Sequence, residues 1–179
     1  MLDKLNAFLQ TVLEWFVIIL MISLTVVVIT AVLFRLSGNS LSWYDEVAAI
    51  QLSWITYYGA ALAALKRRHI GFDSVLLAIP MPWRMMTLAL AEGIVFAFFL
   101  LMAWAGMTVL DVLEGEYLVS LTWVPIQVTQ SVIPIGAGLF ILCQALSLPF
   151  YWKMTARGIS LEHAEIEEEV ETEMQKAGN

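Results

Sequence analysis

Four long stretches of this 179-residue chain lack charged side chains. Residues 15–34, 47–65 and 93–110 contain no Asp, Glu, Lys or Arg, and neither do residues 117–152. A helix rises ~1.5 Å per residue and the apolar core of a bilayer is ~30 Å thick, so about 20 residues are enough to cross it. Because a spanning segment must satisfy its own backbone hydrogen bonds, each stretch is predicted to be helical. The sequence thus predicts an all-α integral membrane protein with four transmembrane helices.

The charged residues divide the chain into a membrane domain and a tail. The predicted spans are at about residues 12–34, 47–65, 85–110 and 128–150. Residues 1–158 therefore form one four-span membrane domain. Residues 159–179 contain seven Glu and one Lys, and are predicted to be an acidic cytoplasmic tail in solvent.

The basic residues are concentrated at one end of the predicted helices. That end carries Lys4, Lys66, Arg67, Arg68, Arg84, Lys153 and Arg157. The opposite end carries the basic residue Arg35 and the acidic residues Asp45, Glu46, Asp111, Glu114 and Glu116. Because loops rich in Lys and Arg stay in the cytoplasm, both termini are predicted to be cytoplasmic.

Composition excludes several classes of protein. The net charge is −7 and no basic face is visible, so no nucleic acid is expected as a partner. Cys143 is the only cysteine, which rules out an internal disulfide, a CxxC redox pair and a zinc–cysteine cluster. A small membrane redox enzyme would need intramembrane histidine pairs or such a cysteine pair. With no catalytic motif in the chain, we predict neither an enzymatic activity nor a cofactor.

Small residues recur at helical spacing in the second and third spans, where they let helix backbones approach closely. They are Gly59 with Ala63, Ala60 with Ala64, and Ala89 with Gly93 and Ala97. We expect these faces to pack within the four-helix unit. Contact with a second protein is the alternative.

Ionisable residues at membrane depth are the usual candidates for function. Glu14 and Glu92 lie near the same ends of their spans, and Arg67, Arg68 and His69 end the second span at a similar level. The favoured interpretation is a structural, buried ion-pair cluster. The alternatives are a carboxylate that couples transport to protons or cations, and a basic loop that binds lipid headgroups.

The loops at the opposite end carry acidic and apolar residues. Ser42 is placed to cap the second helix, with Asp45 and Glu46 in its positive first turn. The alternative is an acidic rim that faces a partner. Residues 118–123 are too apolar for an ordinary aqueous loop and are expected in the membrane interface. Pro134, within the fourth span, is expected to kink it.

Several motifs, taken in order, resemble a known family. They are Ser42-Trp43-Tyr44-Asp45-Glu46-Val47-Ala48, Trp54, Tyr58-Gly59-Ala60-Ala61, Arg67-Arg68-His69-Ile70-Gly71-Phe72-Asp73, Ser120-Leu121, Val124-Pro125 and Ile133-Pro134-Ile135-Gly136. Their order and spacing resemble the small membrane subunit, called DctQ-like or Q, of tripartite ATP-independent periplasmic (TRAP) transporters. The resemblance covers roughly residues 35–140. One departure is Asp45, where the family often has Glu.

The resemblance implies a role in transport without catalysis. In such systems a soluble periplasmic protein captures an organic acid, such as a dicarboxylate, a 2-oxo acid or sialic acid. A large multi-span subunit then carries it across the bacterial inner membrane, driven by a sodium gradient. The small subunit is expected to pack on the immobile scaffold of the large one, and to help dock the periplasmic protein.

The resemblance and the charge pattern indicate two groups of candidate contact residues. Candidates for contact with the large subunit or with membrane lipids are Trp43, Asp45, Glu46, Trp54, Gly59, Ala63, Arg67, Arg68, His69 and Asp73. Candidates for docking the periplasmic protein are Asp111, Glu114 and Glu116. The alternative function is a self-sufficient small transporter that uses Glu14 or Glu92 as its coupling carboxylate. The strong bias in the distribution of Lys and Arg argues against that alternative.

Overall fold

The computed structural model describes residues 2–67 and 73–158. Its helices are α1 (Leu2–Leu36), α2 (Tyr44–Leu65), α3 (Asp73–Ala78), α4 (Trp83–Val112), α5 (Ile126–Gln130) and α6 (Val132–Arg157). Apart from one isolated β-bridge between Tyr117 and Pro125, the regular structure of the described residues is helical. The segments long and apolar enough to cross a membrane are Lys4–Leu36, Tyr44–Leu65, Trp83–Val112 and Ile126–Arg157. The prediction of an all-α protein with four candidate membrane-spanning helices is therefore confirmed.

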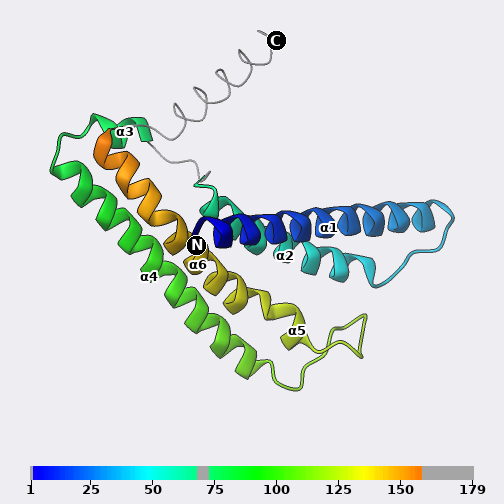
Figure 1. Cartoon of the computed structure of the whole chain (residues 1–179). Coiled ribbons are helices and arrows are strands. Elements are labelled where there is room, and N and C mark those ends of the chain that lie inside the picture. Colours follow the sequence, from blue (N-terminus) through cyan, green and yellow to red (C-terminus); the bar gives the residue numbers. More distant parts are fainter. Residues whose placement is uncertain (1, 68–72, 159–179) are drawn as a thin grey trace, which may run out of the picture.

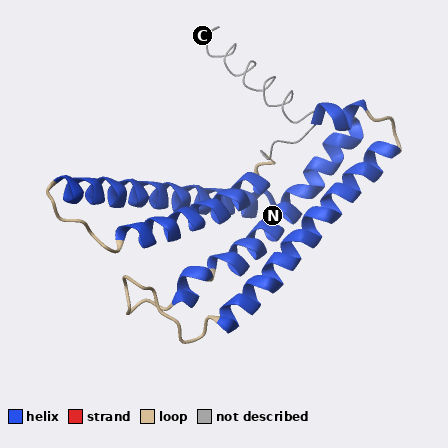
Figure 2. Ribbon diagram, turned by 180° about the vertical axis from the view of Figure 1, so that it is seen from behind, coloured by secondary structure: helices blue, strands red, loops and turns tan. Residues whose placement is uncertain are grey.

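The long helices form two antiparallel hairpins that diverge from each other (Figure 1). One hairpin pairs α1 with α2, and the other pairs α4 with α6. The hairpins meet where α2 packs along α6, as the view from behind also shows (Figure 2). The order of packing is thus α1, α2, α6, α4, an open row rather than a closed bundle.

This open arrangement leaves the two outer helices poorly covered. The most apolar stretch of the segment Ile126–Arg157 is 39% buried inside the chain, compared with 11% for α2 and only 6% each for α1 and α4. A water-soluble protein could not expose so much apolar surface, whereas in a membrane lipid or a partner covers it. The exposed surfaces of α1 and α4 are therefore the faces that such a protein offers to its surroundings.

The buried core lies between α2 and α6, with one residue from α1. Its members are Leu13, Ala61, Ala64, Phe140 and Cys143. The ring of Phe140 stacks on Phe99 of α4, with 3.6 Å between ring centroids.

Gly136 allows α2 and α6 to pack closely. A Cβ atom at this position would lie 2.7 Å from the Cβ atom of Tyr57 on α2. Real Cβ atoms essentially never approach so closely, so glycine is what this crossing requires.

The fourth membrane segment, which contains Pro134 and Pro149, is divided into two helices shortly before Pro134. The break lies at Ser131, where α5 ends and α6 begins. Pro134 follows in the first turn of α6, where a backbone N–H has no partner within the helix. Proline has no N–H to bond the carbonyl four residues earlier, which accounts for an interruption of the helix just before Pro134. The acidic tail, residues 159–179, lies outside the described residues.

Candidate functional site

Arg67, the second residue after α2, is the centre of a buried polar network. Its Nη1 is paired with Oε1 of Glu92 on α4. Its Nε donates to Oγ of Ser147 at 2.8 Å, and its Nη2 donates to the backbone carbonyl of Gln144 at 3.2 Å, both on α6. The guanidinium also lies over the ring of Tyr151, 4.7 Å from its centroid. One side chain thus connects the end of α2 with interior positions of α4 and α6.

Glu92 is held from two directions. While Oε1 meets Arg67, Oε2 accepts a hydrogen bond from Nε2 of Gln144 at 2.7 Å. The side chains of Arg67 and Glu92 are each only 10% exposed. Ser147 completes the network by donating to the carbonyl of Ala64 in the last turn of α2, at 3.1 Å. A buried charge is tolerated when it is paired and hydrogen-bonded in this way.

The backbone of Arg67 adopts a conformation that favours glycine. Its φ is +53°, in the left-handed region, and its N–H bonds to the carbonyl of Ala64 as the helix ends. Glycine is the usual residue at such a position because it has no Cβ. Arg67 thus combines an unfavourable backbone conformation with side-chain contacts to two other helices.

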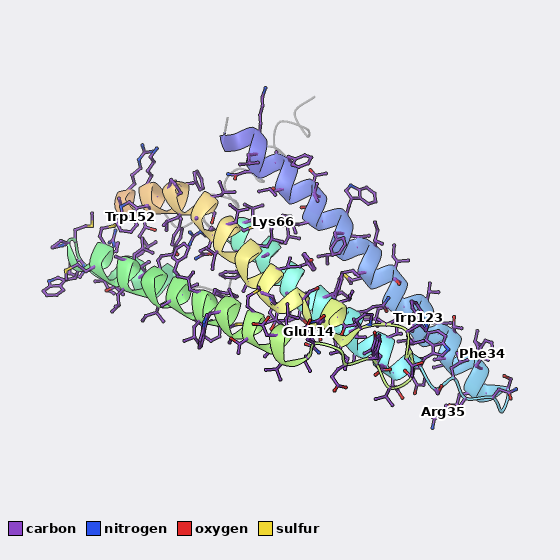
Figure 3. The ribbon with its side chains drawn as sticks, turned by 90° about the horizontal axis from the view of Figure 1, so that it is seen from below. Phe34, Arg35, Lys66, Glu114, Trp123 and Trp152 are labelled. Atoms are coloured by element: carbon purple, nitrogen blue, oxygen red, sulfur yellow. The ribbon has the colours of Figure 1, made fainter. Side chains whose placement is uncertain are left out.

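A second ion pair joins α1 to α2 beside the first. Nζ of Lys66 lies 2.5 Å from Oε1 of Glu14, and Nε2 of Gln10 donates to the same oxygen at 3.0 Å. Both charged side chains are partly exposed. Consecutive residues at the end of α2 therefore reach α1 on one side and α4 on the other. Lys66 occupies the middle of the molecule in Figure 3.

At the other end of α2, Glu46 holds a loop that lies far away in the sequence. Its carboxylate accepts hydrogen bonds from the backbone N–H of Val119 at 3.1 Å and of Ser120 at 2.9 Å, and from the Ser120 hydroxyl. We call the end that carries Asp45, Glu46 and residues 113–125 the acidic end.

The cap predicted for α2 was wrong. The N-cap residue is Trp43 rather than Ser42, and it makes no side-chain capping hydrogen bond. Asp45 and Glu46 do lie in the first turn, as predicted. Glu46 bonds to a distant loop instead of its own helix, and no local pattern could have indicated that contact.

The remaining contact candidates are spread along α2 and beyond. Trp54 donates from Nε1 to the carbonyl of Thr129, 3.1 Å away, so it fastens α2 to α5. Trp43 and Ala63 are half-buried and Asp45 is exposed. Gly59 has no atom within 4 Å of where a Cβ would lie. Arg68 and His69 lie outside the described residues, and Asp73 begins α3 with its side chain outside the description.

The three docking candidates all lie at the acidic end. Asp111, Glu114 and Glu116 are exposed, the first in the last turn of α4 and the others in the loop that follows. Figure 3 shows Trp123 towards the end of the molecule that carries Phe34 and Arg35, Glu114 nearer the middle, and Trp152 towards the opposite end.

The small-residue faces do not behave alike. On α2, Ala64 is fully buried against α6, as expected for packing within the chain. On α4, the expectation was wrong: Ala89, Gly93 and Ala97 are all exposed. The opposite face of α4, which includes Glu92, packs on α6 instead. The α4 stripe, defined by Ala89, Gly93 and Ala97, is therefore open.

Among the described residues, no three His, Cys, Asp or Glu side chains gather closely enough to hold a metal ion. What the described residues do provide is two ion pairs between helices, exposed apolar helix faces and a group of exposed acidic residues at the acidic end. Chemically, such an arrangement fixes helices to one another and presents surfaces to partners.

Comparison with protein families gives a match over most of the chain. The family model for the DctQ component of tripartite ATP-independent periplasmic transporters matches residues 24–149. No curated protein matches the chain.

Proposed function

Because this chain belongs to the DctQ family, the small membrane component of TRAP transporters, we propose that it is a rigid scaffold beside the large transport subunit. The family is a family of transporter components rather than of enzymes. The chain is accordingly a multi-pass membrane protein. What it contributes to transport is the subject of the proposal.

The observation that carries this proposal is that both carboxylates at membrane depth are engaged in ion pairs and hydrogen bonds within the chain. Glu92 is held by Arg67 and Gln144, and Glu14 by Lys66 and Gln10. A carboxylate that carries a proton or a cation must exchange its partner during each transport cycle. Here each one instead joins neighbouring helices, which favours a scaffold over a self-sufficient transporter.

The face that meets the large subunit is proposed to be the α4 stripe. In membranes, small residues allow close approach, and the packing so gained holds helices together. The stripe is exposed and lies on an outer helix of the row, while the matching residues of α2 are partly used within the chain. Gly59 and Ala63 are the secondary candidates.

The acidic end is proposed to face the periplasm and to help dock the substrate-binding protein. Asp111, Glu114 and Glu116 are exposed there and fit a basic patch on that protein. The proposal places both termini in the cytoplasm and the chain in the bacterial inner membrane, in keeping with the positive-inside rule. Sodium-driven uptake of an organic acid is then the activity of the whole complex.

Co-purification with the large subunit tests the packing face. Gly93→Leu adds volume to the α4 stripe where nothing within the chain obstructs it, and should abolish recovery of the large subunit. Ile22→Phe on the exposed face of α1 is the matched control and should leave recovery unchanged. The reverse pattern would move the interface to α1.

A charge-reversal variant tests docking separately. Changing Asp111, Glu114 and Glu116 to Lys should weaken capture-protein affinity while the two membrane subunits still co-purify. Unchanged affinity and unchanged uptake would refute the docking role.

A further inference from the structure

Two residues are the most exposed of the large apolar side chains in the loop at the acidic end. Val119 is 89% exposed and Trp123 is 76% exposed, and we call this pair the loop tip. In the same loop Leu118 is buried, with only 7% of its surface exposed. The loop thus has a packed side and a side on which its apolar residues meet nothing in the chain.

The loop tip belongs to an ordered loop rather than a loose one. The N–H of Leu118 bonds to the carbonyl of Val124 at 3.0 Å, and the N–H of Ile126 bonds to the carbonyl of Glu116 at 3.0 Å. Glu46 adds its contacts with the backbone of residues 119 and 120. The backbone N–H groups of residues 118–120, 124 and 126 therefore have partners within the chain, which holds the loop in one conformation.

The position of the loop identifies what covers the tip. Residues 113–125 connect two membrane-spanning segments, so the loop stays at the bilayer surface. The exposed apolar surface of the helices continues into it: Leu36, which ends α1, is 79% exposed, and Val112, which ends α4, is 76% exposed. Exposed apolar ends of membrane-spanning helices are suited to contact with lipid, and the loop tip adds apolar surface at the same end of the molecule.

We propose that the loop tip is an interfacial anchor that inserts Val119 and Trp123 into the headgroup boundary of the outer lipid leaflet. Tryptophan is enriched at this depth because its ring is apolar while its N–H can reach polar groups. The acidic residues of the same loop, Glu114 and Glu116, remain in water. Such a loop prefers zwitterionic lipid, because anionic headgroups repel its carboxylates.

This anchor divides the loop between two tasks. The carboxylates of Glu114 and Glu116 stay accessible to a soluble partner. The loop tip fixes the height of these carboxylates above the membrane. Glu46 sets the orientation by holding the backbone beside the loop tip. The choice of the outer leaflet rests on the orientation given in the proposed function, whereas insertion of the loop tip rests on the loop geometry and does not depend on which protein the acidic residues meet.

Spin-label accessibility in nanodiscs of palmitoyl-oleoyl phosphatidylcholine tests the anchor. The label is placed at Val119→Cys, at Glu116→Cys as the aqueous control, and at Leu101→Cys on the exposed face of α4 as the lipid control. The native Cys143 is buried, so the parent chain should take up little label. Power saturation then compares collisions with oxygen, which concentrates in lipid, and with a water-soluble nickel complex.

The expected oxygen-to-nickel ratio at position 119 is severalfold higher than at position 116 and close to that at position 101. A ratio at 119 equal to that at 116 would overturn the proposal and leave the loop tip free in water for a soluble protein. Low accessibility to both reagents at 119 would overturn it as well, since another protein surface would then cover the loop tip. All three substitutions replace exposed side chains, so the fold is expected to persist.

Discussion

Replacing Arg67 by leucine should destabilise the protein much more than replacing the neighbouring Lys66. The substitution removes three hydrogen-bonding groups and leaves the carboxylate of Glu92 buried without its cation. Breaking a buried ion pair by removing one partner costs about 3–5 kcal/mol. The backbone strain at position 67 remains in this variant, because leucine also disfavours a positive φ.

The double variant Arg67→Leu/Glu92→Leu should be more stable than Arg67→Leu alone. It leaves no unpaired charge, and a buried pair replaced by apolar residues often has little net effect on stability. The main remaining loss is the buried amide of Gln144, which would lack its carboxylate partner at a cost of about 1–3 kcal/mol. The double variant should therefore regain about 2 kcal/mol relative to the single one.

Unfolding by sodium dodecyl sulfate in mild-detergent micelles, followed by tryptophan fluorescence, measures these differences. Lys66→Leu is the control, because its ion pair with Glu14 is partly exposed and should contribute much less. The reasoning fails if the free energy of unfolding of Arg67→Leu lies within about 1 kcal/mol of that of the parent chain, since breaking a buried ion pair should cost more than this. It also fails if the losses of the two single variants simply add in the double one.

Further predictions concern the helix crossing and the loop. Gly136→Ala should lower the free energy of unfolding by about 1–3 kcal/mol, because the new Cβ would clash with Tyr57. Gly138→Ala places its Cβ in open space and should be neutral or slightly stabilising. The same unfolding assay checks both variants, and equal effects would contradict the packing argument. Glu46→Gln should speed hydrogen exchange of the loop amides that its carboxylate holds, whereas Asp45→Asn, an exposed neighbour, should not. Unchanged exchange in Glu46→Gln would show that the loop is held by other contacts.

The spanning helices could be predicted because the membrane imposes a simple rule on the sequence. Uncharged runs of about 20 residues indicate helices wherever they occur. The level of Glu14, Glu92 and Arg67 could be inferred in the same way, by counting residues from the helix ends. Their partners could not, because that requires knowing which helix lies beside which. The pairing of Lys66 with Glu14 and of Arg67 with Glu92 emerges only from the packing order of the row.

Contacts between distant segments could not be predicted either, because they also depend on which segments lie side by side. Glu46 looked like a residue that stabilises its own helix, since its position in the first turn suits a local role. Its actual partner is Ser120, 74 positions away, and nothing in the spacing links the two. The α4 stripe shows the same limit: a pattern of small residues indicates close packing but does not say whether the neighbour is in the same chain.

Uptake by proteoliposomes under an imposed sodium gradient tests the central claim most directly. Vesicles containing the large subunit are compared with and without this chain, in the presence of the periplasmic capture protein and a labelled organic acid, alongside vesicles that contain this chain alone. The scaffold account predicts uptake only when both membrane subunits are present, and the same uptake when the chain carries Glu14→Gln. Uptake by this chain alone, abolished by that substitution, would contradict the account and make Glu14 a coupling carboxylate.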